Sequence, residues 1–274
     1  GGLIIGGPCV LGLATTMSSM VGVGRGAQSG VLIKNAEALE RMEKIDTLVI
    51  DKTGTLTQGK PKVVAVVPAS GFDEAQVLQL AASAERGSEH PLAAAIVAAA
   101  AGRKIERAPV HDFDAPAGKG VIGMVEGKRF VLGTSKFLTE LNIDPSALAD
   151  EAESLRCDGA TAIFLGIDGK LAGVIAVADP VKATTAEALK ALAAEGIRVV
   201  MLTGDNKTTA QAVAKRLGIT EVEAEVLPDQ KSAVIEKLRR EGRVVAMAGD
   251  GVNDAPALAA AEVGIAMGTG SDVA

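Results

Sequence analysis

The segment DKTGTLT, residues 51–57, places an aspartate directly after a short apolar run that is rich in β-forming residues. Ligands of open α/β sheets bind at the carboxyl ends of strands, so a carboxylate at the tip of such a strand is placed for chemistry. A carboxylate can attack a phosphoryl group and hold it as an acyl phosphate when cations and N–H groups neutralise the charge. The sequence therefore predicts that Asp51 is a nucleophile in phosphoryl transfer.

Two later segments carry groups that bind phosphoryl oxygens. The sequence LTGDN follows an apolar run and puts Thr203 and Gly204 where a hydroxyl and an amide can hold these oxygens. Lys231 lies near the start of a predicted helix and supplies a positive charge. Each feature taken singly has an ordinary alternative, a turn for the first and a solvated helix face for the second.

A third segment, AGDGVNDAP, follows the last apolar run and carries Asp250 and Asp254. Carboxylates are hard oxygen ligands of the kind that Mg²⁺ prefers. Either aspartate could merely terminate a strand. Together with Asp51, Thr203 and Lys231, they predict one site for phosphoryl transfer at the carboxyl edge of a sheet.

The elements that must position these residues alternate between helices and short apolar strands. Such alternation predicts a parallel sheet with helices on both faces. The expected strands are 47–50, 197–202 and 243–248, and the expected helices are 183–194, 207–217 and 230–241.

The middle of the chain follows another pattern. Helices are expected around 73–84 and 89–101, and two hairpins follow, with turns at Glu126-Gly127 and Asp168-Gly169. Hairpins that interrupt an α/β pattern predict an inserted α+β domain, which we place at 69–173.

Composition excludes several other classes of function. The chain has 274 residues and a net charge of -6, so we expect no nucleic-acid partner. Its two cysteines, Cys9 and Cys157, are far apart in sequence and offer neither a disulfide framework nor a clustered zinc site.

The motifs DKTGTLT, TGDN and GDGVNDAPAL resemble the phosphorylation domain of P-type ATPases, which has a haloacid dehalogenase-like fold, and the resemblance covers essentially the whole chain. It implies a phosphorylation domain in two parts, 25–68 and 174–274, with the second part truncated because the chain is a piece of a longer protein. It also implies that Asp51 is the residue that becomes phosphorylated.

The resemblance assigns roles to the other residues of the predicted site. Mg²⁺ would be held by Asp51, Asp250 and the carbonyl of Thr53, with Asp254 counted in the same site. Thr203, Gly204 and Lys231 would bind the phosphoryl group, and Asn253 and Asp254 would support it.

The inserted segments SEHPLA and AGKGV resemble the nucleotide-binding domain of heavy-metal-transporting P-type ATPases. This implies that Glu85 and His90 contact the adenine end of ATP and that three glycines line its pocket, Gly118, Gly120 and Gly133. The family often has Asn after the last glycine. Here Thr134 stands there, so a hydroxyl replaces a side-chain amide.

Two other functions stay open, a soluble phosphatase of the same fold and an inactive nucleotide-binding regulator. Phosphatases of this fold resemble the pattern Asp-x-Asp, whose second carboxylate acts as acid and base. Thr53 occupies that position and cannot act as a base at neutral pH. P-type ATPases bring in the base on a TGE loop of an actuator domain, and this chain contains no TGE. We therefore expect an acyl phosphate that turns over poorly.

Residues 1–24 carry no charged side chain, and about 20 apolar residues can cross a bilayer. Their glycines and hydroxyl residues leave a buried strand and turn as the alternative. The stretch resembles the sixth transmembrane helix of copper-type pumps, so we expect part of a membrane helix in which Pro8 breaks the helix beside Cys9.

The transported ion depends on that helix. Copper-type pumps usually have Cys-Pro-Cys, and two thiolates suit a soft ion such as Cu(I). This chain has Gly7-Pro8-Cys9, so Cu(I) is the first expectation and zinc or another soft metal stays open. The resemblance implies membrane helices, an actuator domain and a metal chaperone as partners, and a place at the cytoplasmic face of a membrane.

Overall fold

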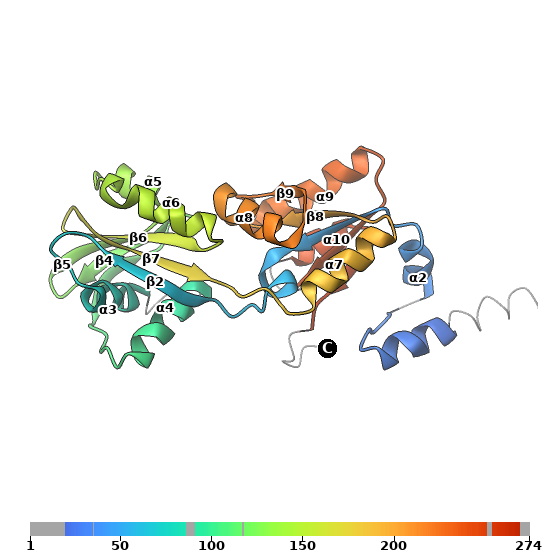
Figure 1. Cartoon of the computed structure of the whole chain (residues 1–274), viewed down its shortest axis with the longest axis horizontal. Coiled ribbons are helices and arrows are strands. Elements are labelled where there is room, and N and C mark those ends of the chain that lie inside the picture. The colour runs from blue at the N-terminus through green and yellow to red at the C-terminus, as the bar shows by residue number, and fades with distance from the viewer. Residues whose placement is uncertain (1–19, 35, 86–90, 117, 251–253, 269–274) are drawn as a thin grey trace, which may run out of the picture.

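The computed structural model describes residues 20–34, 36–85, 91–116, 118–250 and 254–268. Two sheets organise these residues, a parallel sheet of five strands and an antiparallel sheet of six. In Figure 1 the antiparallel sheet lies on the left and the parallel sheet on the right. The chain enters the first sheet, leaves it to build the second, and then returns to complete the first.

The parallel sheet has the strand order β11-β10-β1-β8-β9, and every neighbouring pair is parallel. This confirms the α/β class expected from the alternating pattern. The strands are β1 (Thr47–Asp51), β8 (Arg198–Leu202), β9 (Glu221–Glu223), β10 (Val245–Gly249) and β11 (Val263–Ala266), and the helices are α2 (Ala36–Met42), α7 (Thr185–Ala194), α8 (Lys207–Leu217), α9 (Lys231–Arg240) and α10 (Ala255–Ala260).

Helices cover both faces of this sheet. Alternate strand residues such as Ile50 and Met201 pack with Val213 of α8 on one face. Their neighbours Val49 and Leu202 pack with the α9 and α10 side on the other face. Because both sets are buried, the strands are continuous apolar runs rather than alternating ones.

The antiparallel sheet has the strand order β2-β7-β6-β5-β4-β3. Helices α3 and α4 contribute to the core on one of its faces, and α5 and α6 contribute to the core on the other. The strands are β2 (Lys62–Pro68), β3 (Val110–Asp114), β4 (Gly120–Val125), β5 (Lys128–Gly133), β6 (Thr161–Ile167) and β7 (Lys170–Ala178), and the helices are α3 (Glu74–Ala84), α4 (Pro91–Gly102), α5 (Ser135–Glu140) and α6 (Ala149–Cys157).

Both predicted hairpin turns lie where the sequence indicated. Glu126 and Gly127 join β4 to β5 with φ values of 50° and 73°, and Asp168 and Gly169 join β6 to β7 with φ values of 47° and 78°. Two successive positive φ angles are the geometry that matches the twist of a tight hairpin.

The inserted domain is longer than the expected 69–173. Its sheet begins at Lys62 and ends at Ala178, because β2 pairs antiparallel with residues 173–178 of β7. Residues 62–68 therefore belong to the inserted domain and not to the first part of the phosphorylation domain, for which we expected 25–68. The second part likewise begins after Ala178 rather than at 174.

Of the expected membrane helix, residues 1–19 lie outside the described residues, and residues 20–28 are helical. Within the part of the chain that the structure describes, no helix is both long and apolar enough to span a bilayer.

The two linkers between the domains run antiparallel. Thr57 pairs with Val181, and the backbone N–H of Gln58 donates to the carbonyl of Pro180 at 2.8 Å. The carboxylate of Asp179 accepts hydrogen bonds from the hydroxyl of Thr57 at 2.6 Å and from the backbone N–H of Lys60 at 3.0 Å. The segment that leaves the loop after β1 is thus hydrogen-bonded to the segment that returns to the parallel sheet.

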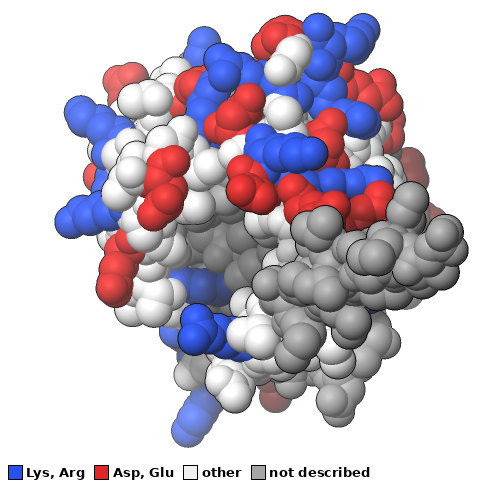
Figure 2. All heavy atoms as spheres, turned by 90° about the vertical axis from the view of Figure 1, so that its right-hand side faces the viewer, with Lys and Arg blue, Asp and Glu red and all other residues white. Residues whose placement is uncertain are grey.

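Charges on the face of the parallel-sheet domain shown in Figure 2 are mixed. Blue and red side chains are interspersed over its upper part. This part of the surface offers no extended basic area for a nucleic acid backbone.

Gly120 and Gly133 are paired across β4 and β5. A Cβ at Gly133 would lie 2.3 Å from the carbonyl oxygen of Lys119, and one at Gly120 would lie 2.1 Å from that of Leu132. Both atoms that block the space belong to the backbone. The chain itself therefore requires these glycines, whatever a ligand requires.

Replacing Gly133 by alanine forces β4 and β5 apart, so we expect Gly133→Ala to lower the free energy of unfolding by about 2 kcal/mol or more. Gly102→Ala is the matched control, because a Cβ at Gly102 meets nothing within 4 Å. Denaturant unfolding followed by circular dichroism measures both. Equal stability of the two variants contradicts the close approach.

Candidate active site

Asp51 ends the central strand β1 and is only 5% exposed. It is level with Leu202 of β8, and Ile50 is level with Ala248 of β10, so all three strands end around it. Thr203 and Asp250 come directly after those neighbouring strands. The carboxyl edge of the sheet therefore brings together the strand-end residues that the sequence predicted.

Lys231 is the first residue of α9, and its ammonium lies between two carboxylates. Nζ donates to Oδ1 of Asp51 at 2.8 Å and to Oδ1 of Asp254 at 2.6 Å. Asp254 is fully buried, and its Oδ2 accepts the backbone N–H of Asp250 at 3.2 Å. Asp51, Lys231 and the loop after β10 thus form one hydrogen-bonded chain.

Two glycines leave the space that this arrangement needs. A Cβ at Gly249 would lie 2.2 Å from Oδ2 of Asp254, so only glycine fits there. Gly54 has a φ of 75° and turns the loop after β1 towards Asp250, whose Cβ would be 3.5 Å from a Cβ at Gly54. Lys182 from the return linker donates to the carbonyl of Gly54 at 2.6 Å and fixes this loop.

Burial raises the pKa of Asp51 to about 6, although the charge and hydrogen bond of Lys231 act to lower it. The charges of Asp254 and Asp250 raise the pKa further. For Lys231, burial lowers the pKa, but the two carboxylates more than offset this, so its pKa is raised. At neutral pH the site holds an ionised nucleophile beside a permanent ammonium.

The residues present fit a divalent cation. Lys231 joins the carboxylates of Asp51 and Asp254, and the backbone N–H of Asp250 donates to Asp254, so three aspartates gather around one ammonium and leave an excess of negative charge. Within the described residues no three acidic or other ligating side chains form a preassembled metal cluster. The half-buried Asp250 faces the loop that contains Thr53 and Gly54, which is where an oxygen-preferring cation is best accommodated.

Asp254 was expected to belong to the Mg²⁺ site, and that role stays a prediction. Both of its carboxylate oxygens are used by the protein, one by Lys231 and one by the backbone of Asp250. Its burial explains this, because a fully buried carboxylate needs both partners to offset its desolvation. Asp254 therefore positions Lys231 and Asp250, while Asn253 lies outside the described residues.

Thr203 is buried, and its Oγ1 accepts the backbone N–H of Asp205 at 3.1 Å. The hydroxyl keeps its own proton for donation. Gly204 beside it is exposed, and the carbonyl of Thr203 accepts the N–H of Val226 at 3.1 Å. The loop after β8 is thus held rigidly with a hydroxyl and an amide near the carboxyl edge.

Sequence reasoning missed a second ion pair at this edge. Nζ of Lys52 lies 2.5 Å from Oδ2 of Asp205, and both side chains are largely buried. Each charge stands in a motif already selected, the lysine of DKTGT and the aspartate of TGDN. Opposite charges just after neighbouring strand ends were the signal that could have revealed this pair.

The expected nucleotide residues lie in the inserted domain. Gly120 begins β4 opposite Gly133 at the end of β5, and Gly118 precedes them with a φ of 72°. Glu85 is buried at the end of α3, a helix that packs against β4 and β5. His90 lies outside the described residues.

Thr134, where the family often has Asn, caps helix α5. Its Oγ1 accepts the backbone N–H of Phe137 at 3.1 Å. The substitution therefore has a local structural role that the sequence comparison with the family pattern did not indicate.

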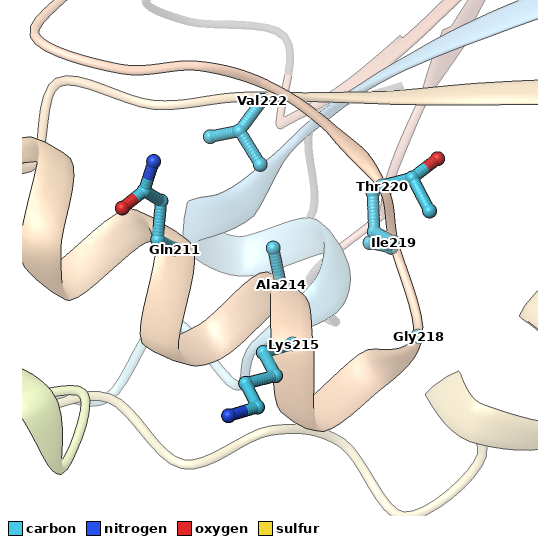
Figure 3. Close-up of a pocket in the computed structure, with 7 residues that line it drawn as sticks. All are labelled: Gln211, Ala214, Lys215, Gly218, Ile219, Thr220 and Val222. Atoms are coloured by element: carbon cyan, nitrogen blue, oxygen red, sulfur yellow. The ribbon is translucent and has the colours of Figure 1, made fainter.

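One surface pocket lies away from this site. It has a volume of about 410 Å³ and is formed by the end of α8 and the start of β9, as Figure 3 shows for Lys215, Ile219 and Val222. It faces the outer edge of the parallel sheet rather than the strand ends beside Asp51. Cys9, the expected contact of a transported ion, lies outside the described residues.

A family model of haloacid dehalogenase-like hydrolases matches residues 45–262. A silver exporting P-type ATPase of Salmonella typhimurium is 60% identical over 99% of this chain and 33% of its own length. A copper-transporting P-type ATPase of Rhizobium leguminosarum bv. viciae is 58% identical over 99% of this chain and 32% of its own length. The chain thus spans about a third of these relatives.

Solved structures show the same likeness. A zinc-transporting PIB-type ATPase in an E2.Pi state superimposes with a TM-score of 0.69 at 38% identity, over 97% of this chain and 43% of that one. The catalytic domain of the CPx-ATPase CopB-B gives a TM-score of 0.69 at 33% identity, over 91% of this chain and 88% of that one. The chain therefore belongs to the haloacid dehalogenase-like hydrolases, within the group formed by the catalytic domains of heavy-metal P-type ATPases.

Proposed function

We propose that this chain is the catalytic part of an ATP-driven pump for a soft heavy-metal ion and that Asp51 accepts the γ-phosphoryl group of ATP. The observation that carries the proposal is the ammonium of Lys231 held between the buried carboxylates of Asp51 and Asp254. An ordinary salt bridge needs one carboxylate. A second, fully buried one fixes the lysine in place when the first reacts.

The chemistry is an in-line displacement. A carboxylate oxygen of Asp51 attacks the γ-phosphorus, the bond to the β,γ-bridging oxygen breaks, and ADP leaves with the electron pair. Lys231 stays beside the new acyl phosphate because Asp254 holds it, and Thr203 donates its hydroxyl proton to a phosphoryl oxygen. Mg²⁺, when bound by Asp51, Asp250 and the Thr53 carbonyl, would neutralise charge on the phosphates.

The acyl phosphate is expected to persist in this chain. Thr53 stands where a phosphatase of this fold has its second carboxylate, and a threonine hydroxyl does not take a proton from water at neutral pH. Hydrolysis then needs a base from elsewhere, which an actuator domain of the full-length protein would bring. This favours a pump over a soluble phosphatase, and the intact set of Asp51, Lys231 and Asp250 argues against a non-catalytic regulator.

The proposed ion is Cu(I), with Ag(I) as an ion of the same softness. The relatives of 58–60% identity are named for copper and silver, whereas the zinc-transporting structure is 38% identical. A thiolate at Cys9 suits either monovalent ion. ATP binding by Glu85, His90 and the glycines Gly118, Gly120 and Gly133, and the membrane helices, actuator domain and metal chaperone as partners, are parts of the same proposal.

Incubation with ATP labelled at the γ-phosphate tests the nucleophile directly. We expect the chain to acquire an acid-stable label that hydroxylamine removes, because that chemistry identifies an acyl phosphate. Asp51→Asn should abolish the label, since an amide is no nucleophile here. Asp229→Asn is a matched control, an aspartate near the start of α9 outside the proposed site, and should keep the label. A label that survives Asp51→Asn contradicts the assignment.

Keeping Asp51 ionised costs folding free energy, which gives a second prediction. Its pKa of about 6 in the folded chain lies above that of an unfolded aspartate, so the folded state binds a proton first as pH falls. The contribution of Asp51 to the stability of the wild type therefore increases as the pH falls from about 6 to about 4. Asp51→Asn lacks this cost and should be more stable at pH 7.5, by about 3 kcal/mol.

The advantage of Asp51→Asn should disappear towards about pH 4, where the aspartate is protonated in the folded protein. Thermal or denaturant unfolding at both pH values measures the difference between the variant and the wild type. A constant difference across this range, or a variant less stable at pH 7.5, overturns the prediction.

A further inference from the structure

A residue of the inserted domain reaches the second ion pair of the site. Thr161 begins β6, and its hydroxyl donates to Oδ1 of Asp205 at 3.2 Å. The other carboxylate oxygen of Asp205 lies 2.5 Å from the ammonium of Lys52, which follows Asp51 in the chain. Two polar contacts therefore connect the inserted domain to the residue beside the nucleophile.

Three other hydrogen bonds hold the domains together around this contact. The hydroxyl of the buried Thr209 donates to the carbonyl of Ala160 at 2.8 Å. The hydroxyl of Thr208 donates to Glu153 at 2.8 Å, and Arg216 donates to the carbonyl of Asp158 at 2.9 Å. Helix α6 lies beside α8 where these bonds form (Figure 1). The docked arrangement does not depend on Thr161 alone.

The backbone of Asp205 is fixed independently of Thr161. Its N–H donates to Oγ1 of Thr203, and its carbonyl accepts the N–H of Glu225 at 2.9 Å. What remains free is rotation of the carboxylate, a torsion with broad preferences. The hydroxyl of Thr161 contacts one carboxylate oxygen and the ammonium of Lys52 contacts the other, and together they restrict this rotation.

We propose that Thr161 is a positioning residue, whose hydroxyl orients Asp205 and thereby Lys52 when the inserted domain is docked on the parallel-sheet domain. The contact makes the orientation of the charged side chain that follows Asp51 in sequence depend on the position of the domain that holds the nucleotide. This inference rests on the proposed function of Asp51 as the phosphoryl acceptor.

The substitution Thr161→Val removes the hydroxyl and keeps the shape. Because the other inter-domain bonds remain, we expect the KM for ATP to change little while the maximal rate of label formation falls about tenfold or more, the effect of losing a hydrogen bond to a charged group. The same loss is expected with acetyl phosphate, a donor without adenosine, because Lys52 is displaced with either donor. Thr161→Ser keeps the hydroxyl and should restore the rate.

Thr208→Val is the matched control. It removes the hydroxyl of a neighbouring inter-domain bond that ends on Glu153 and does not reach Asp205. Its rate should stay near that of the wild type with both donors. Asp205→Asn removes the charge that pairs with Lys52, so adding Thr161→Val to it should lower the rate of label formation little further. If the two residues acted independently, the two fold-losses in rate would multiply.

Rapid-quench measurement of label formation, with melting temperatures to confirm folding, distinguishes the outcomes. Normal rates in Thr161→Val overturn the inference. The inference is also overturned if Thr161→Val and Thr208→Val lower the rate of label formation equally and only with ATP. That result would show that Thr161 helps to dock the inserted domain but does not orient Asp205 and Lys52. A wild-type chain that takes no label from either donor overturns the proposed function instead.

Discussion

The rest of the site depends on one constraint, the burial of an ammonium between two carboxylates at the end of a parallel sheet. Lys231 contacts Asp51 and Asp254 at 2.8 and 2.6 Å in a region with little access to water. Removing Lys231 would leave two buried carboxylates without a compensating charge, which is strongly unfavourable. The surrounding backbone follows from this requirement. Gly249 leaves room for Asp254, and the N–H of Asp250 completes its hydrogen bonds.

Contacts between the two domains also hold the loops of the site in place. The linkers form an antiparallel pair in which Asp179 and Lys182 hold the ends of the catalytic loop, so the loop is fixed where the inserted domain joins the sheet. Helices α6 and α8 add a polar contact next to the TGDN loop. A polar contact of this kind can form and separate at lower cost than an apolar one, which suits domains that move relative to each other.

Much of the fold could be predicted because its signals are local. Buried parallel strands appear as apolar runs, the hairpin turns at Glu126-Gly127 and Asp168-Gly169 carry residues that accept positive φ, and α8 was predicted with its observed bounds, residues 207–217. The bounds of the inserted domain were not predictable in this way. Residues 62–68 pair with β7 more than a hundred positions later, and nothing local distinguishes that pairing from an extended linker.

The residues of the site likewise divide into those that local sequence signals predict and those that depend on contacts between distant segments. Asp51, Thr203, Lys231 and Asp250 follow from their places after strands or at a helix start. The pair of Lys52 with Asp205 and the use of both oxygens of Asp254 depend on how side chains are oriented at the strand ends, which residue spacing does not encode. The glycines at positions 120 and 133 were attributed to a ligand, whereas the backbone contacts across β4 and β5 already require them.

Direct titration of the Asp51 carboxyl tests most closely whether burial against a shared ammonium governs this site. Carbon-13 NMR of labelled aspartate, with Asp51→Asn to assign the resonance, gives its midpoint. The geometry predicts a midpoint near the pKa of about 6 and a clear rise in Lys231→Gln, because the charge that opposes the effect of burial is lost. A midpoint near that of an exposed aspartate, unchanged in Lys231→Gln, would contradict this picture of the site.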